Sequence, residues 1–267
     1  MNRMLIPIVA ALLAAVTTQA QDWAKARLEK SPRHLEWVKV KQGNREVNCF
    51  IAFPEVKEKA TAVVVIHEIF GLSDWVRGVA DQLAEAGYIA IAPDLLSGTA
   101  PGGGGTAELG GGDAVRKAIS SLPPDQITAD LNAVVQYVVK LPANNAKVAV
   151  GGFCWGGTQT FRYATNNKEI KAAFPFYGSG PEKEEDIARI NCPVYGSYGG
   201  NDARVNASIP MSTELMKKAG KTYEPVTYDG AGHGFMRAGE DPKDTNQANK
   251  KAREDAWKRW KDLLKKL

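Results

Sequence analysis

Residues 148–157 read Val148-Ala149-Val150-Gly151-Gly152-Phe153-Cys154-Trp155-Gly156-Gly157. The apolar run predicts a strand buried on both faces, and a helix is expected to start directly after the pattern Gly-x-Cys-x-Gly. Such a sharp turn strains the backbone of its central residue, and glycines on either side avoid the clash of Cβ atoms where strand and helix cross. The turn would present the Cys154 thiol at a helix N-terminus, where free N–H groups and the helix dipole favour a thiolate. The alternative interpretation is a core cysteine that happens to lie between glycines.

Strands and helices alternate on both sides of this turn. The alternation predicts one α/β domain with a mostly parallel, twisted sheet, helices on both faces and an N-terminal β-hairpin. Residues 22–33 are expected to be a polar lead-in, and the Gly-rich residues 97–112 a mobile surface loop that could act as a lid. Strands are predicted at 36–41, 46–53, 61–66, 88–92, 147–151, 172–176, 193–198 and 223–228, and helices at 74–86, 114–120, 126–139, 156–164 and 209–219, followed by a tail helix.

The first 20 residues have the pattern of a secretory signal peptide. Arg3 provides the positive charge, residues 4–16 form a short apolar run, and Thr18-Gln19-Ala20 offers small residues for cleavage after Ala20. The run is too short to span a bilayer comfortably, which disfavours a membrane anchor. We therefore expect residues 21–267 to form one exported domain, periplasmic if the source is Gram-negative, with no membrane association after cleavage.

The composition excludes some classes of partner. Of the 267 residues, 44% are hydrophobic and 24% charged, which is a globular composition. Residues 241–267 contain nine Lys/Arg and five Asp/Glu, and this excess accounts for the whole net charge of +4. Because apolar residues recur there at helical spacing, we interpret the tail as an amphipathic helix with a solvated basic face, and we expect no nucleic-acid partner. The oligomeric state cannot be read from the sequence.

The chain has three cysteines, so at least one thiol stays unpaired. Cys49 and Cys192 could form a disulfide in an oxidising compartment, or they could be small buried hydrophobic residues.

A thiol nucleophile needs a base and an acid that orients the base. His233 lies in a Gly-rich loop after the last predicted strand, and Asp202 follows the strand at 193–198. The order Cys154, Asp202, His233 is the nucleophile–acid–base order of the α/β-hydrolase fold. Asp186 and Asp229 are rival acids, but the first lies in a charged stretch and the second is too close to His233 in sequence. The backbone N–H of Trp155 is placed to donate to a developing oxyanion.

These motifs give the chain a resemblance to the dienelactone hydrolase family. The matching residues run from about Val47 to Phe235, in four motifs: His67-Glu68-Ile69-Phe70-Gly71-Leu72, Gly152-Phe153-Cys154-Trp155-Gly156-Gly157, Gly200-Asn201-Asp202 and Gly232-His233-Gly234-Phe235.

The resemblance implies further roles. Glu68 would hydrogen-bond the resting thiol, and the Ile69 N–H would be the second oxyanion donor. Arg237 matches an arginine that holds a substrate carboxylate, although a solvated surface arginine is an equal alternative. The family's second arginine is missing after Pro93-Asp94-Leu95, and Arg116 is only a weak substitute, which puts the family's acidic substrate in doubt.

The sequence thus predicts a hydrolase of small activated esters or enol-lactones, similar to carboxymethylenebutenolidase, that forms a thioester on Cys154. No organic cofactor is expected, and no Cys/His cluster has the spacing of a metal site. Two other classes stay open: an exported thiol redox protein, which would need a partner cysteine, and a binding protein that has kept the fold without catalysis.

Overall fold

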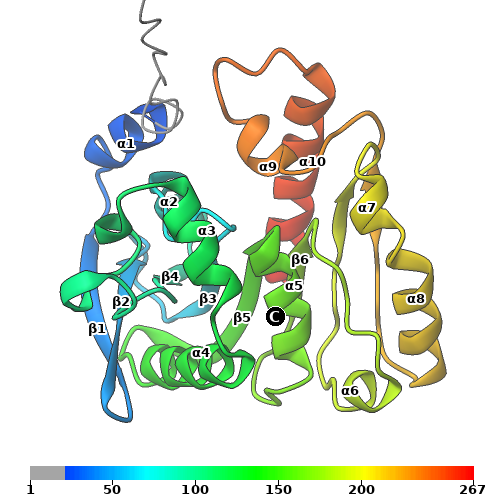
Figure 1. Ribbon diagram of the computed structural model, residues 1–267, viewed down its shortest axis with the longest axis horizontal. Coiled ribbons are helices and arrows are strands. Elements are labelled where there is room, and N and C mark those ends of the chain that lie inside the picture. Colours follow the sequence, from blue (N-terminus) through cyan, green and yellow to red (C-terminus); the bar gives the residue numbers. More distant parts are fainter. Residues whose placement is uncertain (1–21) are drawn as a thin grey trace, which may run out of the picture.

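The central sheet has eight strands in the order β1-β2-β4-β3-β5-β6-β7-β8 (Figure 1). The computed structural model describes residues 22–267, so the predicted signal peptide at 1–20 lies outside the described residues. β1 pairs antiparallel with β2, and β2 pairs antiparallel with β4. All other neighbours are parallel, which confirms the mostly parallel sheet and the N-terminal hairpin. The strands are β1 (Leu35–Gln42), β2 (Arg45–Ala52), β3 (Ala60–Ile66), β4 (Ile89–Pro93), β5 (Asn144–Phe153), β6 (Ala173–Phe176), β7 (Ser197–Gly199) and β8 (Val226–Tyr228).

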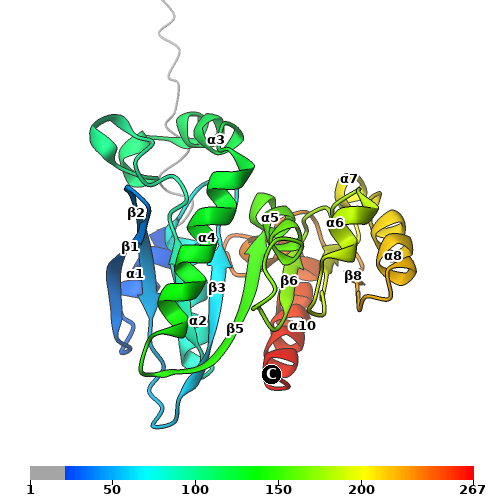
Figure 2. The same ribbon diagram turned by 90° about the horizontal axis from the view of Figure 1, so that it is seen from below.

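Helices pack on both faces of this sheet, as Figure 2 shows from below. None of the helices within residues 22–267 combines the length and the apolar character needed to cross a bilayer. The helices are α1 (Asp22–Glu29), α2 (Asp74–Glu85), α3 (Gly112–Ser120), α4 (Pro124–Val139), α5 (Trp155–Ala164), α6 (Glu184–Ala188), α7 (Ala203–Asn206), α8 (Ile209–Lys218), α9 (Phe235–Ala238) and α10 (Gln247–Leu264).

Alternate residues of the central strands pack into two separate hydrophobic cores, one on each face of the sheet. In β3, Val63 and Val65 pack with residues of α2 and α10 on one face. Val64 and Ile66 pack with residues of α4 and α5 on the other face. Every residue of β3 is buried, as the continuous β-branched run predicts for a strand covered on both sides.

The tail helix α10 closes the first core through Trp260, which is 1% exposed. Its ring lies 4.9 Å from the ring of Phe176 and 6.0 Å from that of Phe153. A Cβ on Gly151 would come within 2.6 Å of the same indole, so this glycine makes room for it. The predicted amphipathic tail is therefore confirmed, and it supports the strand that ends at Cys154.

One local prediction was wrong. The expected polar lead-in forms the helix α1, because Ala24 and Leu28 bury one side of it against the first core. Of the two alternatives for Cys49 and Cys192, the structure has the second: both thiols are free and buried, with no disulfide between them.

The Gly-rich segment 97–112 contains two short 3₁₀ turns, Pro101–Gly103 and Ala107–Leu109. It is tied to the end of β4 by Thr106, whose N–H and hydroxyl donate to the buried Asp94 carboxylate over 2.8 and 2.7 Å. The Thr106 hydroxyl also accepts from the Leu72 N–H at 3.1 Å. This anchor joins the segment to the loop that follows β3.

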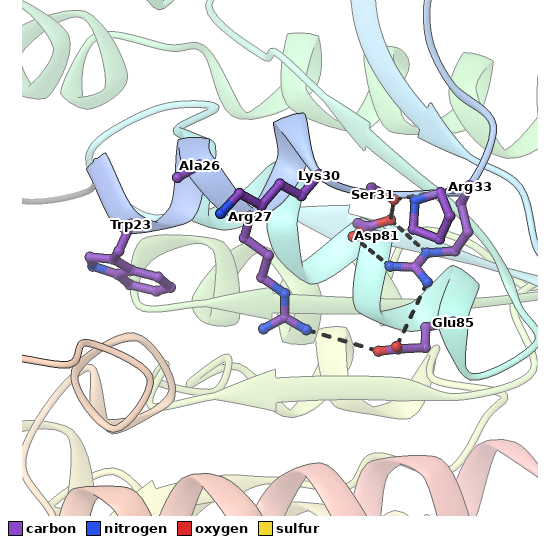
Figure 3. A pocket seen from close by; sticks show the side chains of 9 residues that line it. Trp23, Ala26, Arg27, Lys30, Ser31, Arg33, Asp81 and Glu85 are labelled. Atoms are coloured by element: carbon purple, nitrogen blue, oxygen red, sulfur yellow. Dashed lines mark hydrogen bonds and ion pairs between the residues drawn. The ribbon is translucent and has the colours of Figure 1, made fainter.

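A hollow of about 590 Å³ lies between α1 and α2 (Figure 3). Its arginines are paired with acids: Arg33 binds Asp81 at 2.7 Å, and Arg27 lies 3.9 Å from Glu85. The Arg27 pair joins α1 to α2, and the Arg33 pair joins the loop after α1 to α2, so the hollow belongs to the packing of the N-terminal segment.

We predict that Trp260→Ala lowers the free energy of unfolding by about 3–5 kcal/mol, because it leaves a cavity among aromatic rings. Trp37→Ala is the matched control, since Trp37 is 54% exposed. Chemical denaturation followed by circular dichroism measures both. A loss in Trp260→Ala no larger than in Trp37→Ala would contradict this view of the core.

Candidate active site

The carboxyl ends of the parallel strands converge at one edge of the sheet, where α/β folds place their ligands. Glu68 follows β3, Cys154 follows β5 and Tyr177 follows β6. Asp202 comes after β7, and His233 after β8. Residues spread over 166 positions of the sequence are thereby brought to the same edge.

The turn between β5 and α5 holds Cys154 at φ 57° and ψ −118°, a conformation that is strained for a residue with a Cβ. Two close approaches enforce the turn. A Cβ on Gly152 would come within 2.4 Å of the Gly156 carbonyl oxygen, and one on Gly156 within 2.3 Å of the His67 carbonyl oxygen. The Cys154 N–H donates to the Phe176 carbonyl at 3.0 Å, which fixes the turn to β6.

Cys154, His233 and Asp202 form a continuous chain of contacts. His233 Nε2 lies 3.1 Å from Cys154 Sγ, and His233 Nδ1 lies 2.5 Å from Asp202 Oδ2. The Asp202 side chain is only 5% exposed, and its second oxygen accepts the Val205 N–H at 3.3 Å as the N-cap of α7. The rival acids lie elsewhere: Asp186 pairs with Arg189 at 2.6 Å on α6, and Asp229 is exposed.

The hydrogen bond to Cys154 raises the pKa of His233 to about 9. Asp202 raises this pKa as well, while burial opposes both. A protonated imidazole next to sulfur favours the thiolate. At neutral pH the His233 imidazole is therefore protonated where it meets the Cys154 sulfur.

Glu68 and Arg237 form an ion pair at the same edge of the sheet as Cys154, His233 and Asp202. Arg237 Nε donates to Glu68 Oε2 at 2.7 Å, and the Glu68 side chain is 2% exposed. The guanidinium also lies over the ring of Phe70, 5.3 Å from its centroid. Arg237 is thus not a solvated surface arginine. In this arrangement Glu68 binds Arg237, and the hydrogen bond of the thiol is to His233.

Arg116, the weak substitute for the family's second arginine, is not part of the ion pair of Glu68 and Arg237. Arg116 lies on α3, where it bonds Asp113 at 2.5 Å, and 47% of its side chain is exposed.

Two backbone N–H groups at this edge of the sheet have no protein acceptor. Within residues 22–267, neither the Ile69 N–H after β3 nor the Trp155 N–H at the first position of α5 donates to a backbone or side-chain acceptor. Free N–H groups of this kind can stabilise a negative oxygen.

Tyr177 is a site residue that the sequence interpretation missed. It is fully buried, has φ 39°, and its ring meets the His233 imidazole edge-on at 5.1 Å. Burial raises its pKa well above the ordinary value, and the nearby Glu68 charge adds to this. Its place directly after a buried strand was the only signal in the sequence.

No group of three or more His, Cys, Asp or Glu side chains in the described part of the chain could hold a metal ion.

Known proteins with similar sequences and folds match most of the chain. The sequence profile of the dienelactone hydrolase family matches residues 47–267. A relative from Methylorubrum extorquens named carboxymethylenebutenolidase is 31% identical over 239 residues, covering 85% of this chain and 79% of its own length. One of the same name from Salmonella typhimurium is 32% identical, covering 71% and 73%. The crystal structure of a Klebsiella pneumoniae dienelactone hydrolase superposes with a TM-score of 0.76 at 25% identity, covering 88% and 99%.

We predict that Cys154→Ala lowers the pKa of His233 from about 9 toward its ordinary value of 6.5, because the largest cause of the shift is removed. An NMR titration of the imidazole protons measures this, with the exposed His34 as internal reference. The raised pKa also contributes stability that is fully present below pH 6.5 and is lost as the pH rises through about 9. An unchanged His233 titration in the variant would show that the hydrogen bond to Cys154 does not raise the pKa of His233.

Proposed function

The chain belongs to the dienelactone hydrolase family, and from this premise we propose that it cleaves small activated esters or enol-lactones with Cys154 as nucleophile. The observation that carries the proposal is the unbroken contact from Cys154 Sγ through His233 to the Asp202 carboxylate. Thiolates attack esters whose leaving groups are stable, and amides are harder targets for them. The substrate class is therefore a small ester or lactone, as in the relatives named carboxymethylenebutenolidase.

In the first step the Cys154 thiolate attacks the ester carbonyl carbon, and a C–S bond forms. The tetrahedral intermediate collapses as the ester C–O bond breaks, and the leaving oxygen takes the proton held on His233 Nε2. Asp202 stabilises the imidazolium and fixes its orientation through Nδ1.

In the second step His233, now neutral, accepts a proton from water as the water oxygen attacks the thioester. The C–S bond breaks, the carboxylic acid product leaves, and the thiolate–imidazolium pair is restored. Both steps place a negative charge on the former carbonyl oxygen. The free N–H groups of Ile69 and Trp155 are the donors we assign to it.

Arg237 is the residue that we assign to a substrate carboxylate. Its Nε atom is engaged by Glu68, and 31% of the side chain is exposed. The remaining guanidinium nitrogens could meet an anionic substrate group, since a guanidinium binds a carboxylate through several N–H donors at once.

A redox function has less support than ester hydrolysis. Cys49 and Cys192 are both buried, and burial raises the pKa of both thiols, the latter to about 12. Neither is suited to resolve an oxidised Cys154, because a thiol that stays protonated is a poor nucleophile.

We also propose export through the N-terminal signal pattern, with cleavage after Ala20. Expression of the full chain in a Gram-negative host should give a periplasmic protein that begins at Gln21, as determined by N-terminal sequencing. A cytoplasmic protein with residues 1–20 intact would contradict this.

We expect Cys154→Ala to reduce kcat/KM for 4-nitrophenyl acetate by about 10³-fold or more, because no other group can form the acyl-enzyme. Cys192→Ala is the matched control and should keep full activity, since that thiol is buried outside the site. Equal activity of Cys154→Ala and the unaltered enzyme would rule out the nucleophile.

The carboxylate assignment is tested with a matched pair of substrates, 4-nitrophenyl acetate and the 4-nitrophenyl monoester of succinic acid. Arg237→Gln should lower kcat/KM about tenfold more for the succinate than for the acetate, because one charge-assisted contact is lost. An equal loss of kcat/KM for both esters would mean that Arg237 does not bind the substrate carboxylate.

A further inference from the structure

His67 is a buried titratable residue that the mechanism above does not use. It directly follows β3, precedes Glu68 and is 0% exposed. Burial lowers its pKa, so the imidazole is neutral and cannot serve as a charge partner. The Nε2 atom of His67 has no hydrogen-bond partner within the described residues. The side chain therefore makes its polar contact through Nδ1 and its apolar contact through the face of the ring.

The Nδ1 atom of His67 lies 2.8 Å from the carbonyl oxygen of Glu68. A carbonyl oxygen can only accept, so Nδ1 carries the proton and donates. The Gly71 N–H donates to the same oxygen at 3.1 Å. This carbonyl is therefore held from two directions.

The Glu68 carbonyl and the Ile69 N–H belong to the same peptide group. Because the peptide group is planar, fixing the direction of the C=O fixes the direction of the N–H. The hydrogen bond from His67 thus aims the Ile69 N–H. It also polarises the peptide and makes that N–H a better donor.

The ring face of His67 reaches the second donor. It stacks on the Trp155 indole with centroids 5.4 Å apart and planes at 15°. Trp155 contributes its backbone N–H at the first position of α5, and its neighbour Gly156 packs against the His67 carbonyl. One side chain therefore contacts the Glu68 carbonyl, which shares a peptide group with the Ile69 N–H, and the ring of Trp155.

We propose that His67 is a positioning residue that aligns both oxyanion donors, Ile69 through the Glu68 carbonyl and Trp155 through ring stacking. The inference rests on the proposed ester hydrolysis, because only a reaction with an oxyanion needs these donors. His67 touches neither the substrate nor Cys154 and takes no part in proton transfer.

Two substitutions separate the two contacts. His67→Phe keeps an aromatic ring for Trp155 but removes the donor to Glu68. His67→Asn keeps an N–H donor near the position of Nδ1 but removes the ring. His34→Phe and His34→Asn are the matched controls, since His34 has an exposed side chain beside Glu36. Circular dichroism checks that each variant is folded.

The readouts are steady-state hydrolysis of 4-nitrophenyl acetate and the rate at which iodoacetamide alkylates Cys154. Alkylation uses the same thiolate but forms no oxyanion. Removing an oxyanion donor outright costs about 10²–10³ in kcat, so misaligning donors should cost less. We expect His67→Phe to lower kcat about 10–100-fold and His67→Asn severalfold, with KM within about threefold and the alkylation rate unchanged in both.

Two results would overturn the proposal: a kcat in His67→Phe equal to that of the unaltered enzyme, or alkylation slowed in proportion to kcat, which would indicate a merely structural role. If His67→Phe does not fold, His67→Asn decides by the same criteria. Failure of the proposed function gives a different result, namely full activity in Cys154→Ala, and is recognised independently of the His67 variants.

Discussion

The site depends on the lack of space at the turn between β5 and α5. A Cβ on Gly152 or Gly156 would collide with backbone oxygens at 2.4 and 2.3 Å, so the helix starts closer to the sheet than other residues would permit. The approach forces Cys154 to φ 57° and directs its side chain out of the sheet edge. The strain is offset by the two cores around β3 and β5, which fix the turn from both faces.

The parallel sheet places the other polar groups of the site next to this turn. Each neighbouring strand ends at the same edge, so short loops after β3, β7 and β8 deliver an acid, a second acid and a base. The charged side chains occur in pairs, Asp202 with His233 and Glu68 with Arg237. Pairing is needed because burying a carboxylate without a partner costs free energy. The proposed reaction needs the first pair for proton transfer and leaves the second to meet the substrate.

The sequence predicted the fold and the contacts of Cys154, His233 and Asp202 because they depend on local patterns and on strand order. Gly152 and Gly156 mark a turn at any site of this kind, and a buried strand is recognised by its β-branched residues. The sequence could not predict that Arg237 turns toward Glu68, because this contact depends on the four-residue helix α9 and on packing over Phe70. It also missed α1, whose burial depends on a partner helix distant in sequence.

In the proposed mechanism the sulfur of Cys154 carries the acyl group of the substrate. Rapid acid quench of the enzyme during turnover of 4-nitrophenyl acetate, followed by mass spectrometry of its peptides, tests this directly. We expect an acetyl group on the peptide that contains Cys154, gained and lost at rates that match turnover. An acetyl group on another residue alone, or product formed in a burst with no acetylated peptide, would contradict it.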